Sequence, residues 1–146
     1  VFWLVQYYED GTTNTQRIVV ANSEADILNN NWFWYDFRPE NYGFDSSGFE
    51  LDFPDIAVSD NFLYHTTNVY KIDTDEFVGS VWARYPLDEI SQEQGLNYSY
   101  VVAPNISSLR VAQGATSTAY FAGQNSTTSI RLYRYPDSGD TGKPGS

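Results

Sequence analysis

The chain contains no cysteine and no methionine, and its only histidine is His65. The absence of cysteine excludes disulfides, thiolate-bound zinc, thiolate-held clusters and thiol nucleophiles. A histidine-based metal site ordinarily needs at least two histidines, and no serine lies in a G-x-S-x-G pattern beside which His65 could act as a base. We therefore interpret His65 as an ordinary strand residue in the segment LYHTTNVY at 63–70.

Basic residues are scarce. The chain has 8 Lys and Arg against 19 Asp and Glu, which gives a formal net charge of −11. Such a charge repels phosphate backbones and anionic lipid surfaces, so we expect no nucleic-acid partner. No apolar run approaches the roughly 20 residues that span a bilayer, so we also expect no membrane insertion.

The chain lacks an initiator methionine and begins at Val1-Phe2-Trp3, in what reads as the middle of a strand. We expect either a removed signal peptide or a piece excised from a longer protein, and a secreted, extracellular location. Three Asn-x-Ser/Thr sequons, at Asn97, Asn105 and Asn125, predict glycosylation if the source is eukaryotic.

A packed core is predicted by the composition. Of 146 residues, 41% are hydrophobic and 17% aromatic, too much apolar material for a disordered chain. Charged residues make up only 18%, so Ser, Thr, Asn, Gln and Tyr must supply much of the surface. We expect a single domain over residues 1–138 and a flexible tail over 139–146.

Almost every segment reads as a short strand rich in Val, Ile, Tyr, Phe, Trp and Thr, bounded by turn residues. Strands are expected at 1–8, 16–21, 32–37, 55–60, 61–70, 77–85, 97–102, 108–113, 117–123 and 129–135. The helical candidates are one turn at 23–26 and a start at Pro86. The fold class is therefore all-β.

Similar segments recur along the chain at intervals of about 40 to 50 residues. Pro39, Pro86 and Pro136 each follow an aromatic strand that carries arginine, and the tripeptides at 84–86 and 134–136 are both Arg-Tyr-Pro. Upstream of these tripeptides, further residues match in pairs if each spacing differs by one residue: Ile56 with Val111, Ala57 with Ala112, Tyr64 with Tyr120 and Asn68 with Asn125.

Repeats of this length with several strands each are typical of β-propeller blades. We expect about three four-stranded antiparallel units, at 1–39, 40–86 and 87–138. Three blades are fewer than the four to eight that close a propeller. The chain would then complete a ring by oligomerising or be part of a larger propeller. A β-sandwich with a coincidental repeat is the alternative.

The segment LDFPDIAVSDNFLYHTTNVY at 51–70 resembles the blade hairpins of large secreted bacterial β-propeller-like proteins of uncharacterised function. The residues that carry the resemblance are Asp52, Phe53, Pro54, Ile56, Asp60, Leu63, Tyr64, Thr66 and Asn68. The later segments VGSVWARYPLDEI and TAYFAGQNSTTSIRLYRYPDSG resemble the strands that follow in the same group. The resemblance spans roughly residues 50–138 and implies a blade rather than an activity, because such proteins include adhesins, scaffolds, binding modules and some enzymes.

Two short segments carry candidate site residues. In KIDTDEF, Asp73, Asp75 and Glu76 are candidate calcium ligands, although the spacing is not that of an EF-hand and a solvated acidic turn explains it more simply. In NNNWFWYDF, strand alternation places Trp32, Trp34 and Asp36 on one face. Exposed rings beside a carboxylate would bind sugar, whereas we expect packing into the core as the simpler role for these rings.

No compact catalytic motif is present, so the sequence favours a secreted or surface-exposed, non-catalytic module that binds glycan or protein or serves as a structural unit. The alternative is an extracellular hydrolase acting on polysaccharide, which requires two carboxylates about 5 to 10 Å apart across a cleft. Calcium, as a stabiliser of loops, is the single cofactor considered. No catalytic residue is identified from the sequence, and further propeller blades or self-association are the expected protein partners.

Overall fold

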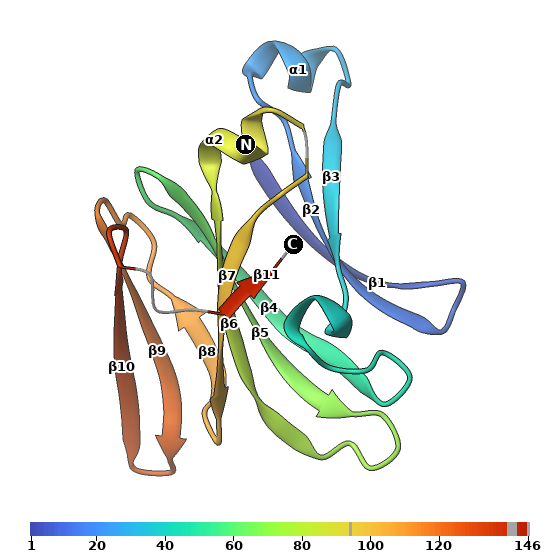
Figure 1. The fold of residues 1–146 in the computed structure, drawn as a ribbon, viewed down its shortest axis with the longest axis vertical. Coiled ribbons are helices and arrows are strands. Elements are labelled where there is room, and N and C mark those ends of the chain that lie inside the picture. Colours follow the sequence, from blue (N-terminus) through green and yellow to red (C-terminus); the bar gives the residue numbers. More distant parts are fainter. Residues whose placement is uncertain (94, 140–142, 146) are drawn as a thin grey trace.

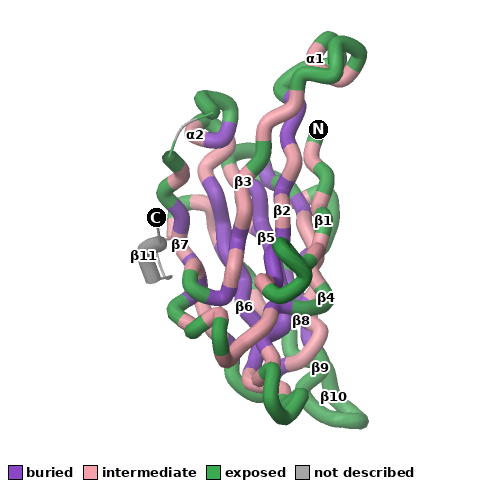
Figure 2. Tube along the Cα trace, turned by 90° about the vertical axis from the view of Figure 1, so that its right-hand side faces the viewer, coloured by how far each residue is buried: buried purple, intermediate pink, exposed green. Residues whose placement is uncertain are grey.

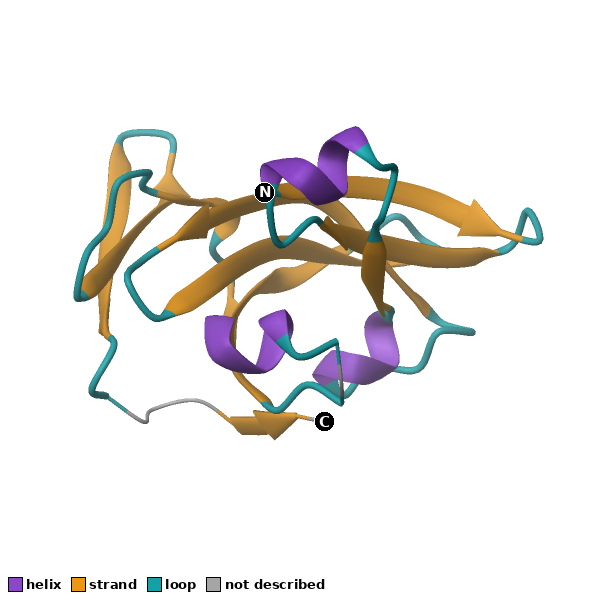
Figure 3. Cartoon of the chain, turned by 90° about the horizontal axis from the view of Figure 1, so that it is seen from above, coloured by secondary structure: helices purple, strands orange, loops and turns teal. Residues whose placement is uncertain are grey.

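The structure is a computed structural model that describes residues 1–93, 95–139 and 143–145. Strands form three antiparallel sheets, which we call A, B and C, and the helical segments are short (Figures 1 and 3). The predicted all-β class is confirmed. Among the described residues, no helix has the length and apolar character needed to cross a bilayer.

Sheet A comprises β1 (Phe2–Glu9), β2 (Thr13–Val20) and β3 (Phe33–Phe37), in that order. Between β2 and β3, helix α1 (Glu24–Leu28) begins where the Ser23 hydroxyl accepts a hydrogen bond from the Asp26 amide, as the predicted capping turn requires. Leu4 of β1 lies opposite Ile18 of β2. Because strands that follow one another in the chain are antiparallel neighbours, sheet A is a simple meander.

Sheet B has the strand order β11-β7-β6-β5-β4. Its strands are β4 (Phe49–Val58), β5 (Phe62–Lys71), β6 (Phe77–Pro86), β7 (Tyr98–Pro104) and β11 (Lys143–Gly145). A 3-10 helix, η1 (Pro39–Tyr42), precedes β4, and α2 (Leu87–Ser91) follows β6. Sheet C, with order β10-β9-β8, comprises β8 (Ser107–Val111), β9 (Thr118–Ser126) and β10 (Ser129–Pro136).

Sheet B lies between the other two sheets. Along β5, Leu63 and Val69 belong to a core shared with sheet A, whereas Tyr64 belongs to a second core shared with sheet C. This follows from the alternation of side chains across a strand. Buried residues accordingly run through the middle of the molecule, while the β9–β10 hairpin is largely exposed (Figure 2).

A β-bulge in β4 makes this strand contribute to both cores. From Asp52 to Asp55 the chain advances three residues along β4, whereas their partners on β5, Asn68 and Thr66, are two residues apart. Phe53, within this bulge, adopts a left-handed backbone with φ 57°. An extra residue reverses the alternation of the strand. Leu51 therefore packs toward sheet A, and Ala57 packs toward sheet C.

Each strand expected from the sequence is present, with ends shifted by a few residues and β4 beginning earlier, at Phe49. The sheets divide between β3 and β4 and between β7 and β8, so β7, from the expected 87–138 unit, pairs with β6. Within the expected tail, Lys143–Gly145 pair with β7, whereas 140–142 and 146 lie outside the described residues. None of the sheets of the described chain closes on itself.

Candidate functional site

The outward face of sheet A carries exposed aromatic rings. In β3, Phe33, Tyr35 and Phe37 pack toward sheet B, while Trp34 and Asp36 point away from it. Trp34 is 53% exposed, so the expectation that its ring packs into the core is wrong. The predicted alternation nevertheless holds for Trp34 and Asp36.

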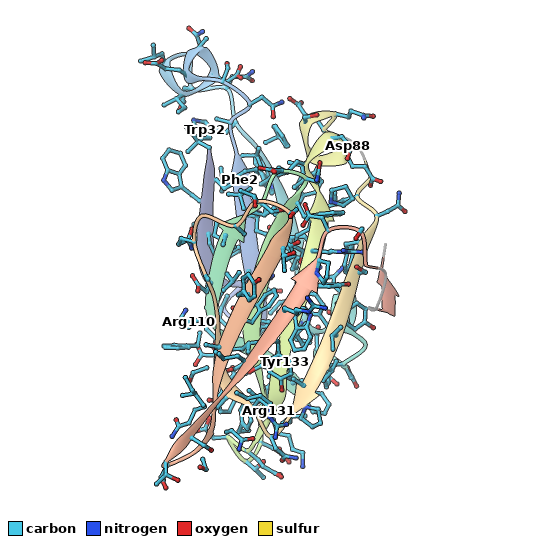
Figure 4. The ribbon with its side chains drawn as sticks, turned by 90° about the vertical axis from the view of Figure 1, so that its left-hand side faces the viewer. Phe2, Trp32, Asp88, Arg110, Arg131 and Tyr133 are labelled. Carbon is cyan, nitrogen blue, oxygen red and sulfur yellow. The ribbon has the colours of Figure 1, made fainter. Side chains whose placement is uncertain are left out.

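Trp32, immediately before β3, extends this surface along the sheet. Its ring centroid lies 4.3 Å from that of Trp3 on β1, with the planes inclined by 39°. Trp3 is 50% exposed, and Val5, on the same face of β1, is 46% exposed. Figure 4 shows Trp32 at the margin of the molecule. We call this surface, made of Trp3, Val5, Trp32, Trp34, Arg17 and Asp36, the tryptophan face.

Arg17 of β2 organises the polar part of the tryptophan face. Its Nε and Nη2 atoms donate to the two carboxylate oxygens of Asp36 at 2.7 and 2.8 Å, a bidentate pair. Nη2 also donates to the Tyr7 hydroxyl at 2.8 Å. The guanidinium carbon lies 4.7 Å from the Trp34 ring centroid, close enough for a cation–π contact. One arginine therefore holds both the ring and the carboxylate in place.

Arg17 and the neighbouring Tyr7 both keep their protons near neutral pH. The hydrogen bond to Asp36 raises the pKa of Arg17, so the guanidinium stays charged. Burial, followed by the nearby Asp36 carboxylate, raises the pKa of Tyr7, so the phenol stays protonated. The tryptophan face therefore presents a charged guanidinium beside aromatic rings.

His65 lies on β5 in the core and is 1% exposed. Its Nδ1 is 3.0 Å from the Tyr42 hydroxyl, which is in turn 2.7 Å from the Tyr85 hydroxyl. Burial lowers the pKa of His65 to about 3, so the imidazole is neutral. The side chain therefore serves as a hydrogen-bonded core residue of the strand.

The acidic residues Asp73, Asp75 and Glu76 lie exposed in the turn between β5 and β6. Glu76 accepts a hydrogen bond from the Lys71 ammonium at 2.6 Å, and Asp75 has a left-handed backbone with φ 55°. Nowhere in the described chain are three or more His, Asp or Glu side chains grouped so that they could hold a metal ion.

The sequons are accessible. Asn97, Asn105 and Asn125 are all exposed, with Asn105 in the turn between β7 and β8 and Asn125 near the end of β9. Each of these positions is therefore open to modification.

The sequence did not predict a polar cluster around Asp137, directly after the second Arg-Tyr-Pro tripeptide. Its carboxylate accepts hydrogen bonds from Tyr64 at 2.7 Å, from Asn61 at 2.9 Å and from Ser59 at 3.1 Å. Arg84 donates to the Asp137 carbonyl at 3.2 Å. The cluster ties the end of β10 to sheet B and leaves the carboxylate engaged by protein groups, which favours a structural role.

No protein-family model matches the chain, no curated protein was found to match it, and no solved structure was found to match it.

Proposed function

We propose that this chain is a non-catalytic, secreted or surface-exposed module that binds its ligand through the tryptophan face. The observation that carries the proposal is the half-exposed Trp34 ring, held by Arg17 beside the Asp36 carboxylate. Large aromatic rings are normally buried when a protein folds. Exposed apolar patches with polar rims mark interaction surfaces. Ordered rings also lose little conformational entropy on binding.

The chemistry of the face suits a glycan or a protein surface. Trp32 and Trp34 offer flat rings for the C–H groups of a sugar, and Asp36 and Arg17 offer an acceptor and donors for its hydroxyl groups. The same combination of tryptophan, tyrosine and arginine is typical of the energetic centres of protein interfaces.

A glycan-array screen of the intact protein, with and without a calcium chelator, tests the glycan ligand. Binding without release of product, weakened about tenfold or more by Trp34→Ala, supports the proposal. Phe62→Ala serves as an aromatic control away from the tryptophan face and should leave glycan binding unchanged, since Phe62 packs against the core between sheets B and C. Silence on the array removes the glycan and leaves a protein ligand or a structural role.

The competing proposal, a polysaccharide hydrolase, makes a different prediction on the same array. Product would appear during incubation, and chelation would slow its release if calcium held the loops at Asp73, Asp75 and Glu76. Product release would overturn the non-catalytic proposal.

We further propose that the sheets are blades of an incomplete β-propeller. Two observations support this: each sheet contains a continuous antiparallel meander, and the sheets stack face to face in chain order. Cores on both faces of sheet B favour a row of blades over a sandwich, which has one core between two sheets.

A further inference from the structure

The hairpins of sheets B and C repeat the same register. In sheet B, Tyr64 of β5 lies opposite Arg84 of β6. In sheet C, Tyr120 of β9 lies opposite Arg134 of β10. The matched tyrosines and the Arg-Tyr-Pro tripeptides of the sequence are therefore in equivalent structural positions.

The two hairpins also share a backbone hydrogen bond at equivalent positions. After Pro86, the Leu87 amide donates to the Asn61 carbonyl at 2.9 Å. After Pro136, the Asp137 amide donates to the Ser117 carbonyl at 2.9 Å. The β5–β6 and β9–β10 hairpins are thus two copies of one unit, and the face of one can be compared with the face of the other.

Equivalent residues of the two hairpins differ sharply in exposure. Tyr64 and Trp82 lie beneath sheet C and are 0% and 9% exposed. Their counterparts, Tyr120 and Leu132, are 56% and 70% exposed on the outer face of sheet C. Figure 4 looks onto this side of the molecule, with β9 and β10 in front. The outer face of sheet C is thus an uncovered copy of a face that sheet B buries.

The repeat also identifies the kind of face that would cover the outer face of sheet C. Tyr85 of β6 faces sheet A, and the equivalent Tyr135 of β10 faces sheet B. Sheets B and C therefore each turn the face that carries this tyrosine toward the sheet that precedes them in the chain. Sheet A comes first in this row, and its face that points away from sheet B is the tryptophan face.

Local charge agrees with this pairing. In a chain of net charge −11, strands β9 and β10 contain no acidic residue, and Arg134 lies on the outer face of sheet C beside Leu132. The strands of sheet A contribute two carboxylates, Glu9 and Asp36, and each is paired with an arginine, Arg38 and Arg17 respectively. Pairing these two faces therefore brings no unpaired carboxylates of the sheet strands together, which limits the repulsion between two acidic molecules.

We infer that two copies of this chain associate head to tail, with the tryptophan face of each copy covering the outer face of sheet C of the other. Two copies supply six sheets, within the four to eight that close a propeller, so a twofold ring leaves neither face uncovered. The inference rests on the proposed function, because it names a protein partner for the same face.

Sedimentation velocity over a range of concentrations tests the inference with three matched substitutions. Leu132→Glu places a charge on the outer face of sheet C, and Val5→Glu places one on the tryptophan face. Leu28→Glu is the control, because Leu28 is 78% exposed on α1 and belongs to neither face. The wild type and Leu28→Glu should form the same dimer, while Leu132→Glu and Val5→Glu each weaken association at least tenfold. Because all three residues are exposed, none of the three substitutions should change the circular dichroism spectrum.

A wild type that stays monomeric at every concentration overturns the inference. Sensitivity to Leu132→Glu alone indicates pairing of two sheet C faces, and sensitivity to Val5→Glu alone indicates pairing of two tryptophan faces; either result also overturns it. The glycan array separates this inference from the proposed function. A monomer whose glycan binding depends on Trp34 retains the function without the dimer, whereas a monomer with no Trp34-dependent binding removes both the dimer and the glycan ligand.

Discussion

The phenol of Tyr64 donates a 2.7 Å hydrogen bond to Oδ1 of Asp137, which joins the centre of sheet B to the residue that follows β10. Burial, followed by this hydrogen bond, raises the pKa of Tyr64 well above its ordinary value, so the phenol remains a donor. The contact connects two units that are far apart in the sequence, and we expect it to stabilise the packing of sheet C on sheet B.

Tyr64→Phe should lower the free energy of unfolding by about 1.5 to 3 kcal/mol, because it removes a hydrogen bond to a charged acceptor. Urea denaturation followed by tryptophan fluorescence measures the change. Tyr120→Phe is the matched control: its ring is 56% exposed, and the change should stay within about 0.5 kcal/mol in the monomer. Equal effects of the two substitutions would show that the bond to Asp137 contributes nothing.

The tryptophans should separate into structural and surface residues. Trp82 is 9% exposed and its ring centroid lies 5.5 Å from that of Phe121, so Trp82→Ala should cost about 3 to 5 kcal/mol. Trp34→Ala, on the exposed face, should cost less than about 1 kcal/mol. Thermal or urea unfolding checks both values, and loss of folding in Trp34→Ala would remove Trp34 as a binding residue.

Stability should fall in acid partly through His65. Its pKa is lowered from 6.5 to about 3 by burial, so between these values the unfolded chain binds a proton that the folded chain does not. The contribution of His65 is therefore complete above pH 6.5 and is lost as the pH falls toward 3, at up to about 1.4 kcal/mol per pH unit.

His65→Gln isolates this contribution from that of the carboxylates, because glutamine is polar and does not titrate. The difference in unfolding free energy between wild type and variant should shrink as the pH falls from 6.5 toward 3. Urea midpoints measured across this interval supply the comparison. Parallel pH profiles would mean that His65 titrates normally in the folded protein.

Close packing of β9 against Ile106, the residue just before β8, leaves little room for a side chain at Gly123. A Cβ at this position would lie 2.5 Å from Cγ2 of Ile106, which is 2% exposed and has little room to move. Gly123→Ala should therefore destabilise by about 1 to 3 kcal/mol. Gly95→Ala is the control, since nothing lies within 4 Å of its added methyl group, and it should be neutral within about 0.5 kcal/mol. A neutral Gly123→Ala would show that Ile106 can shift freely.

Local patterns in the sequence predicted much of the strand structure. β5 and β6 alternate side chains between two cores, and both are bounded by turn residues, so their positions follow from propensity and period. The capping turn at Ser23 was also predicted, because its hydrogen bond closes within a few residues. Trp34 and Asp36 were assigned to one face for the same local reason.

Whether a strand face is exposed to solvent was harder to predict than which side chains share that face. Alternation places Trp34 and Asp36 on one face of β3, but it does not say which face meets another sheet. The bonds from Arg17 to Asp36 and from Tyr64 to Asp137 join positions distant in sequence, and no local pattern pairs such residues. The β4 bulge at Phe53 likewise moved Ala57 into the second core against simple alternation.

The sequence by itself determined the all-β class and the succession of strands, because propensity, side-chain period and turn chemistry act over a few residues. Only the tertiary structure decided that β7 pairs with β6, that His65 is buried and neutral, and that Trp34 faces outward. These features depend on which sheets stack, and stacking is set by the burial of whole faces contributed by residues far apart in the chain.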